Sequence, residues 1–222
     1  ASASSMVAGK LLDALARLPG YSGQNADAFK AYTQAKLADF EGDTETWVEL
    51  PQDRWPKSWF RPDGSCKYHR PVVRLLRNLY GHPLAGLWWE KHCHNKIVEC
   101  GYEKIQGWEC LYRYPEKKAF LSVYVDDFKM AGIKANIPVA WDLIQSNGIQ
   151  LDPPTPFEQY LGCGQVQSTI THEEALQRLA NISNLLPGIQ SLNPIMQGDS
   201  ATPGQGASSA TPPATKLTIN QC

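Results

Sequence analysis

The sequence lacks several features that would place it in a specialised class of protein. No apolar run reaches the ~18 residues that a membrane-spanning helix requires, and the N-terminus lacks the basic and then apolar layout of a signal peptide. Net charge is also nearly absent, at −1 over 222 residues. We therefore expect no membrane partner and no overall attraction to polyanions, so any such attraction must come from a local patch.

The cysteines also lack the paired spacing that a disulfide framework or a zinc motif shows. Reduced thiols in an intracellular, cytoplasmic protein are therefore the simpler interpretation. His92 and His94, with Cys93 and Cys100 nearby, invite a zinc hypothesis because both residue types bind zinc. Residues two apart point to different sides of a helix, so we do not expect this cluster to share one ion. The six cysteines are Cys66, Cys93, Cys100, Cys110, Cys163 and Cys222.

Apolar spacing and turn residues predict both helices and strands. Helical periodicity marks residues 4–18, 82–101 and 172–186. Alternating or β-branched apolar runs bounded by turn signals mark strands at residues 46–50, 110–114, 119–125 and 128–131. We therefore expect an α+β fold, in which a small antiparallel sheet is covered by helices on one face.

The composition changes after residue 167. A helical extension is expected at 168–192, but beyond it the chain is rich in Ser, Thr, Pro, Gly and Ala. No charged residue lies between Asp199 and Lys216. Such a stretch cannot bury enough apolar surface to offset the entropy lost on ordering. We therefore expect residues 193–222 to be disordered.

One strongly basic stretch stands out against the neutral background. It contains a single acid, Asp63, and four interleaved aromatic residues. Basic groups neutralise phosphates and aromatic faces stack on bases, so a nucleic-acid contact is one interpretation. A solvated loop with buried tryptophans is the other, and the sequence does not separate them. The bases are Arg54, Lys57, Arg61, Lys67, Arg70, Arg74 and Arg77, and the aromatic residues are Trp55, Trp59, Phe60 and Tyr68.

Two adjacent carboxylates, Asp126 and Asp127, lie between two expected strands and so at the tip of a hairpin. Two like charges in contact repel by about 4 kcal/mol at an effective dielectric near 20. A divalent cation removes this repulsion, because hard ions such as Mg²⁺ take oxygen ligands. The alternative is an ordinary polar turn, since Asp is common in turns.

A series of short motifs surrounds this pair in a fixed order. A segment ending at Asp27 is followed by Ala31, Tyr32 and the small residue Ala35. The later motifs are TWVELP, LYGHPLAGLWW, Gly101 with Tyr102, CLY, YVDD and YLG. This order, over roughly residues 24–167, resembles the palm of the reverse transcriptases encoded by copia-type (Pseudoviridae-like) LTR retrotransposons.

The resemblance implies a two-metal RNA-directed DNA polymerase. Asp27 and Asp126 would bind two Mg²⁺ ions, with Mn²⁺ as an alternative, and Asp127 would support them. Tyr32 and Tyr124 would contact the substrate, Tyr32 as the gate that selects deoxynucleotides. The implied partners are an RNA template, a DNA primer, deoxynucleotide triphosphates and the remainder of the Pol polyprotein. An intact element of this kind would work inside a virus-like particle.

Departures from the family pattern accompany this resemblance. The family has Lys-Gln where this chain has Pro83-Leu84, which removes a polar contact near the incoming nucleotide. Nearly all of the basic fingers segment is missing before Asp27, and residues beyond 167 do not resemble a thumb. We therefore expect a truncated fragment with incomplete fingers and thumb, whose polymerase activity alone is weak or absent.

The expected domains follow from these boundaries. They are an N-terminal helix and linker at 1–23, the palm-like domain at 24–167, the helical extension at 168–192 and the disordered tail at 193–222. Two alternatives to a working polymerase stay open. One is a catalytically dead retrotransposon relic that binds nucleic acid through residues 54–77, and the other is a plain α+β domain with an acidic turn.

Overall fold

A computed structural model of the protein describes residues 4–40, 42, 45–161, 163–169, 171–185 and 216–221. The chain divides into two compact units, Ala1–Leu161 and Gly162–Cys222. Within the described ranges, no helix has both the length and the apolar character needed to cross a membrane. The first unit includes the N-terminal segment 1–23, which the sequence placed outside the palm-like domain.

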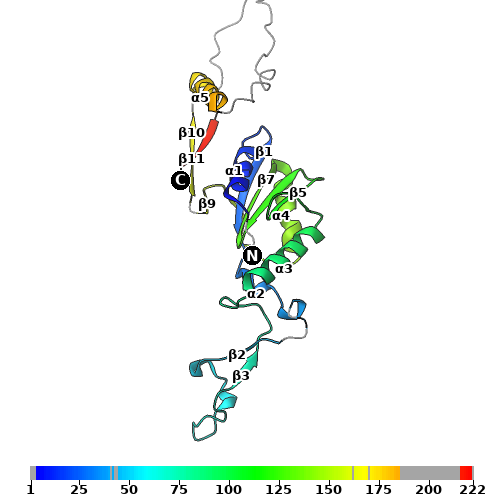
Figure 1. Ribbon diagram of the computed structural model, residues 1–222, viewed down its shortest axis with the longest axis vertical. Helices are drawn as coiled ribbons and strands as arrows, with labels where there is room; N and C mark the ends of the chain where they lie inside the picture. Colours follow the sequence, from blue (N-terminus) through cyan, green and yellow to red (C-terminus); the bar gives the residue numbers. More distant parts are fainter. Residues whose placement is uncertain are drawn as a thin grey trace, which may run out of the picture. The chain divides into compact units, whose positions relative to one another are not determined.

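A six-stranded antiparallel sheet forms the centre of the first unit (Figure 1). Its strand order is β4-β5-β6-β7-β1-β8, so β1 lies beside β7, a strand from much later in the chain. The three strands expected around the YVDD motif are confirmed as β5, β6 and β7. The bounds are β1 Tyr21–Asp27, β4 Glu103–Lys104, β5 Leu111–Tyr114, β6 Ala119–Tyr124, β7 Asp127–Ile133 and β8 Thr155–Pro156; β9 is Gln159–Tyr160.

The two faces of this sheet carry separate apolar cores. Leu121 and Met130 belong to the larger core, whereas their neighbours Phe120 and Ala131 contact the smaller one. Side chains alternate along a strand, so these cores lie on opposite faces. Helices α3 (Ala85–Glu99) and α4 (Ile137–Ser146), the latter preceded by the short turn η4 (Lys134–Asn136), cover the first face, and α1 (Met6–Leu15) covers the second. The fold is α+β, but the expectation of helices on one face only is wrong.

Small residues explain why α1 packs against the sheet. Its periodicity was read from large apolar side chains, yet Leu11 is exposed, whereas Ala8 and Leu12 are fully buried. Gly9 allows close approach, because a Cβ atom there would lie 3.0 Å from the ring of Tyr160. A helix face made of small residues therefore serves as the packing surface.

A buried ion pair also joins α1 to the sheet. The Lys129 ammonium group lies 2.6 Å from a carboxylate oxygen of Asp13, and the lysine is fully buried. The same ammonium group lies 4.4 Å from the ring centroids of both Phe157 and Tyr160. A buried charge needs such a partner, and aromatic faces add attraction for a cation. Helix α1 is thus tied to the domain that the sequence analysis expects to begin at residue 24.

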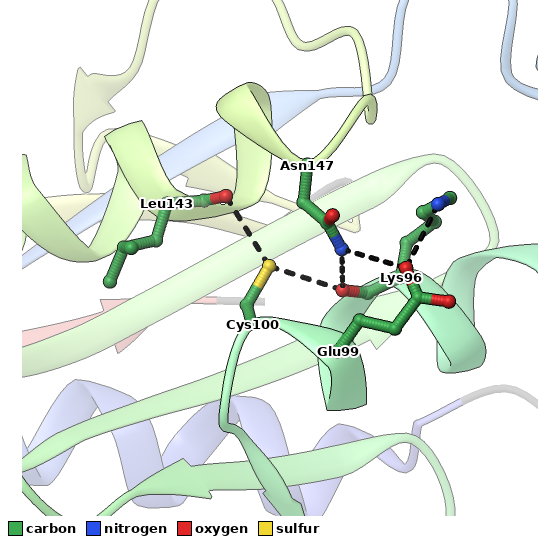
Figure 2. A network of polar contacts seen from close by, with 5 residues as sticks. All are labelled: Lys96, Glu99, Cys100, Leu143 and Asn147. Carbon is green, nitrogen blue, oxygen red and sulfur yellow. Dashed lines mark hydrogen bonds and ion pairs between the residues drawn. The ribbon is translucent and has the colours of Figure 1, made fainter.

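Helices α3 and α4 are linked at their C-terminal ends (Figure 2). The thiol of Cys100 donates to the backbone carbonyl oxygens of Lys96 (3.1 Å) and Leu143 (3.3 Å). The side-chain amide of Asn147 donates to the same Lys96 carbonyl (2.7 Å) and to the Glu99 carboxylate (3.2 Å). The Lys96 and Leu143 carbonyls also accept backbone N–H groups, so these bonds add side-chain donors to both and join the ends of the two helices.

A long excursion leaves the sheet between β1 and α3 and contains the basic stretch. We call residues 45–77 the arm. Every residue of the arm is exposed or half-buried. The strand expected at residues 46–50 is confirmed as β2, which pairs with β3. The elements of the excursion are α2 Ala31–Gln34, η1 Leu37–Asp39, β2 Trp47–Glu49, η2 Gln52–Arg54, η3 Lys57–Trp59 and β3 Val72–Arg74.

The described part of the second unit contains two strands and a helix. Strands β10 (Cys163–Thr169) and β11 (Lys216–Gln221) pair antiparallel. The expected helix is confirmed as α5 (His172–Leu185), and it begins with a capping box in which Thr171 and Glu174 exchange hydrogen bonds. Residues 216–221 were expected to be disordered, and their pairing with β10 corrects that. Residues 193–215 lie outside the described residues.

Candidate active site

The Asp126-Asp127 pair lies at the tip of the β6–β7 hairpin, as the sequence predicts. Tyr124 and Asp127 face each other as the last pair of the ladder, which leaves Val125 and Asp126 as a two-residue turn. Val125 has φ of 56°, a left-handed conformation that costs a β-branched residue roughly 1–3 kcal/mol. Such strain persists only where the surrounding structure holds it in place, which is common at functional sites.

A hydrogen bond from α3 holds this strained turn. The indole Nε1–H of Trp89 donates to the backbone carbonyl of Val125 at 2.7 Å. Trp89 is almost fully buried, so its ring is fixed by the larger core. The sequence places Trp89 in an expected helix, and nothing local to the Leu-Trp-Trp motif indicates which indole reaches the turn.

The third carboxylate comes from β1. Asp27 is the last residue of that strand and lies directly opposite Asp127 in the β1–β7 ladder. The amide of the next residue, Ala28, donates to the backbone carbonyl of Asp126 at 2.7 Å, which ties the end of β1 to the turn. Directly opposed residues have Cβ atoms about 4.5–5.5 Å apart. The structure therefore brings the three predicted carboxylates together from two distant segments.

These carboxylates are coupled electrically. The pKa of Asp127 is raised to about 6, first by burial and then by the negative charges of Asp126 and Asp27. A hydrogen bond with the Asp27 side chain acts in the same direction. Asp127 is half-buried, whereas Asp27 and Asp126 are exposed. The site thus brings three acidic groups close enough to raise one another's cost of ionisation.

Two tyrosines lie next to the turn on the helical side. The rings of Tyr32 and Tyr80 are 4.3 Å apart between centroids. The pKa of Tyr80 is raised, first by burial and then by the charge of Asp126, so its hydroxyl lies within the field of that carboxylate. Tyr124 is 37% exposed at the other side of the turn. In the sequence, Tyr80 is recognisable only as part of the Leu-Tyr-Gly motif, which indicates no role for it.

Gln34 fixes the segment that carries Tyr32. Its side-chain amide donates to the carbonyl oxygens of Phe29 (2.7 Å) and Gln150 (2.9 Å), and its own carbonyl accepts from the Gln150 amide (2.8 Å). This bridge closes a loop between positions that are 116 apart in the sequence. Apolar periodicity gives no indication of this role of Gln34, because a polar side chain that bonds to distant backbone groups produces no periodic pattern in the sequence.

A small cavity of about 40 Å³ lies behind the turn. Its volume suits one or two water molecules rather than a substrate. The residues that line it are Tyr32, Gly86, Trp89, Glu90, Cys93, Cys110, Tyr112, Val123 and Val125. Within the described residues, no three His, Cys, Asp or Glu side chains are placed to hold one metal ion together.

The predicted basic residues all belong to the arm, but they differ in their partners. Three of them pair with acids: Arg54 with Asp53, Arg70 with Glu49 and Arg74 with Glu45. Three others bond to neutral oxygen atoms: Arg61 to Ser65 and Cys66, Lys67 to Ser58, and Arg77 to Gln34. The side chain of Lys57 makes no hydrogen bond or ion pair among the described residues. The two groups of bases thus differ in how much charge they leave for a ligand.

Comparison with known proteins gives a partial match to yeast retrotransposon polyproteins. Over 70 residues, 31% of this chain, the sequence is 29% identical to the truncated transposon Ty1-A Gag-Pol polyprotein of Saccharomyces cerevisiae (strain ATCC 204508 / S288c). The transposon Ty1-DR4 Gag-Pol polyprotein of the same organism matches to the same extent. The match spans only 6% and 4% of the length of these two relatives.

Other comparisons add no family. No protein-family model matches the chain, and no solved structure matches it. The similarity to the Ty1 polyproteins supports a copia-type retrotransposon origin for the chain.

Proposed function

We propose that the first unit is the palm region of an RNA-directed DNA polymerase from a copia-type retrotransposon. The observation that carries this proposal is the register of β1 and β7, which sets Asp27 opposite Asp127 with Asp126 in the adjoining turn. Partial similarity to Gag-Pol polyproteins and the order of the sequence motifs support it. The fold alone does not, because many unrelated functions share α+β architectures.

The carboxylates fit divalent cations in chemistry. All three offer oxygen ligands, which Mg²⁺ and Mn²⁺ prefer. The pKa of Asp127 is raised first by burial and then by repulsion from Asp126 and Asp27, and a cation would relieve that repulsion. Asp27 and Asp126 are the proposed ligands, with Asp127 as the supporting carboxylate. The described side chains form no three-ligand group, so water and substrate oxygens would complete the coordination of each ion. Bound Mg²⁺ would neutralise charge on the attacking and leaving oxygens of a phosphoryl transfer.

The proposed reaction is attack by a primer 3′-hydroxyl on the α-phosphate of a deoxynucleotide triphosphate. The bond from the α-phosphorus to the bridging oxygen breaks, and pyrophosphate leaves. Within this scheme, Trp89 holds the turn, so that positioning is settled before the substrate binds. Tyr32, supported by its contact with Tyr80, would exclude a ribose 2′-hydroxyl. Tyr124 would contact the substrate from the exposed side of the turn.

The remainder of the machinery would come from other parts of a polyprotein. An RNA template, a DNA primer and a triphosphate need basic surfaces larger than this chain provides before Asp27. We therefore expect weak or no primer extension by the chain alone. The second candidate, a relic that only binds nucleic acid, is favoured by the exposed bases and aromatic rings of the arm.

A thermal-shift experiment tests the metal site without requiring turnover. Mg²⁺ or Mn²⁺ should raise the melting temperature by several degrees, because a ligand that binds only the folded state stabilises it. Asp126→Asn and Asp27→Asn should abolish the shift. Asp142→Asn, an exposed carboxylate on α4, is the matched control and should retain it. Equal shifts in the wild type and Asp126→Asn would contradict the proposed site.

A primer-extension assay then separates the two candidates. A polymerase palm that binds metal should give at least trace extension of a DNA primer on RNA with Mn²⁺, and Asp126→Asn should remove it. A relic should show neither the metal shift nor extension, while still binding oligonucleotides. Robust extension with Mg²⁺ would instead show that the chain is complete enough to work alone.

A further inference from the structure

The arm carries an exposed cluster of aromatic rings. The ring of Trp59 makes edge-to-face contacts with the rings of Trp55 and Tyr68. The distances between ring centroids are 5.8 Å to Trp55 and 5.9 Å to Tyr68. Phe60 extends the cluster, 6.2 Å from Trp55. Tyr68 is 52% exposed, and the other three rings are only half-buried. Since no arm residue is buried, this cluster is not a closed core, and apolar surface of this kind commonly marks a binding site.

The basic side chains beside the rings leave positive charge available for a ligand. Lys57, Arg61 and Lys67 have no carboxylate partner among the described residues, whereas three other arm bases do. Arg61 and Lys67 instead bond to neutral oxygens, which fixes their direction without neutralising them. The nearby acid Asp63 accepts two hydrogen bonds from Ser65 and so faces its own turn. We call residues 55–68 the tip of the arm. The tip therefore combines an aromatic surface with net positive charge.

We propose that the tip of the arm binds single-stranded nucleic acid, with bases stacked on the exposed aromatic rings and phosphates held by Lys57, Arg61 and Lys67. Single strands can turn unpaired bases toward aromatic side chains, whereas a duplex hides its base faces in its own stack. This inference rests on the proposed function, because a polymerase must hold its template unpaired. Of the seven basic residues predicted from the sequence, it assigns three to phosphate contacts, and it specifies a single strand rather than a duplex as the ligand.

Charge complementarity decides against an acidic protein segment as the occupant. A peptide carboxylate has no flat face to match four rings, whereas each nucleotide offers a phosphate and an aromatic base together. Base–aromatic stacking contributes about 1–3 kcal/mol per base and tolerates any sequence. The proposed ligand is therefore recognised by its backbone charge and its unpaired bases, not by its sequence.

Fluorescence anisotropy with a labelled single-stranded oligonucleotide and a hairpin duplex of equal length tests the proposal. The experiment uses the full chain in EDTA, so that no metal-dependent step contributes. We expect the single strand to bind at least about fivefold more tightly than the duplex, because only it can stack. The logarithm of its affinity should fall with the logarithm of salt concentration with a slope near −2, as expected for about three phosphate contacts.

Charge-reversal variants identify the residues. Lys57→Glu, Arg61→Glu and Lys67→Glu combined should lower single-strand affinity about tenfold or more and flatten the salt slope. The matched control reverses three exposed lysines outside the arm, Lys10, Lys91 and Lys134, and should lose less. Because Arg61 and Lys67 also bond within the arm, Lys57→Glu alone serves as the second variant. The Lys57 side chain makes no hydrogen bond or ion pair among the described residues, so its replacement should leave the fold of the arm unchanged, which circular dichroism of the variant checks.

A ring variant separates stacking from charge. Tyr68→Ala should reduce the preference for single strand over duplex while leaving the salt slope unchanged. Equal affinity of the wild type for both forms, equal losses in the arm and control variants, or equally good competition by polyglutamate would each overturn the proposal. Asp142→Asn, an exposed carboxylate on α4 outside both proposed sites, should bind as the wild type does, and binding in EDTA requires no metal. Failure of the arm to bind is thereby distinguished from failure of the carboxylates to hold metal.

Discussion

The carboxylate site and the arm present opposite charges on different supports. Asp27 and Asp127 sit at the ends of strands beside the buried residues Ala26 and Phe128, and Asp126 lies in the adjoining turn. The turn between them is held in a strained conformation by a buried indole. In the arm, by contrast, no residue is buried, and its strands β2 and β3 have three residues each.

This difference matches the accuracy that each kind of chemistry needs. Two-metal phosphoryl transfer depends on oxygen positions within a fraction of an ångström, which only a packed scaffold supplies. Contacts to a flexible polyanion depend mainly on the number of charges and rings in reach. Three measurements test whether the carboxylate site and the arm differ in rigidity, and the one with the largest expected effect comes first.

Removal of one large side chain should destabilise the sheet around the carboxylate site much more than the arm. Phe128→Ala in β7 should lower the free energy of unfolding by about 3–5 kcal/mol, because the ring is fully buried beside the site. Tyr68→Ala in the arm should cost less than about 1 kcal/mol, since that ring is half in solvent already. Urea denaturation of both variants measures this. Similar losses would show that the arm is packed as firmly as the sheet.

Loss of the indole bond to the turn should have an intermediate effect. Trp89→Phe keeps an aromatic ring but leaves the Val125 carbonyl without its donor, so stability should fall by about 1–2 kcal/mol. Trp88→Phe is the matched control, because Trp88 is equally buried and has no indole hydrogen bond with the described residues. Indistinguishable unfolding curves for the two variants would mean that the bond does not support the turn.

The coupled carboxylates should produce the smallest effect, a pH dependence. The folded pKa of Asp127, about 6, lies above its usual value of 3.8, so the folded state binds the proton more tightly than the unfolded state. Stability should therefore fall as pH rises from about 4 to 6. Because Asp127 is only half-buried, solvent screening reduces the change to about 1 kcal/mol.

Asp127→Asn isolates this contribution. In EDTA, the stability of the variant should decline less than that of the wild type between about pH 4 and 6, measured by urea denaturation at each pH. Parallel declines would place the cause in other carboxylates. The arm offers no counterpart, since three of its acids pair with arginines and the pKa of the fourth, Asp63, is lowered by its hydrogen bonds with Ser65.

Local sequence patterns predicted much of the sheet and the turn. Apolar alternation through Leu121 and Val123, followed by two aspartates, identifies a hairpin because strand periodicity and turn chemistry agree there. The residues that build the site from a distance leave weaker signals. Asp27 was assigned through motif order alone, since no periodic pattern determines which strand lies beside β7.

The missed features share one physical cause, namely contacts between segments distant in sequence. The role of Trp89 depends on the carbonyl of Val125, and that of Gln34 on the backbone of Gln150. The packing of α1 through Ala8 and Gly9 depends on a sheet formed by later segments, so periodicity within the helix does not indicate it. Composition predicted disorder at residues 216–221, where pairing with β10 decided the outcome.

The pairing of β1 with β7 also sets the order of events during synthesis. Asp27 and Asp127 are one hundred positions apart, so a ribosome has exposed the first long before the second exists. The nascent chain must keep β1 available throughout that interval, with its edge open to other partners. Any product that stops before β7 therefore carries no assembled carboxylate site, whatever the quality of its upstream motifs.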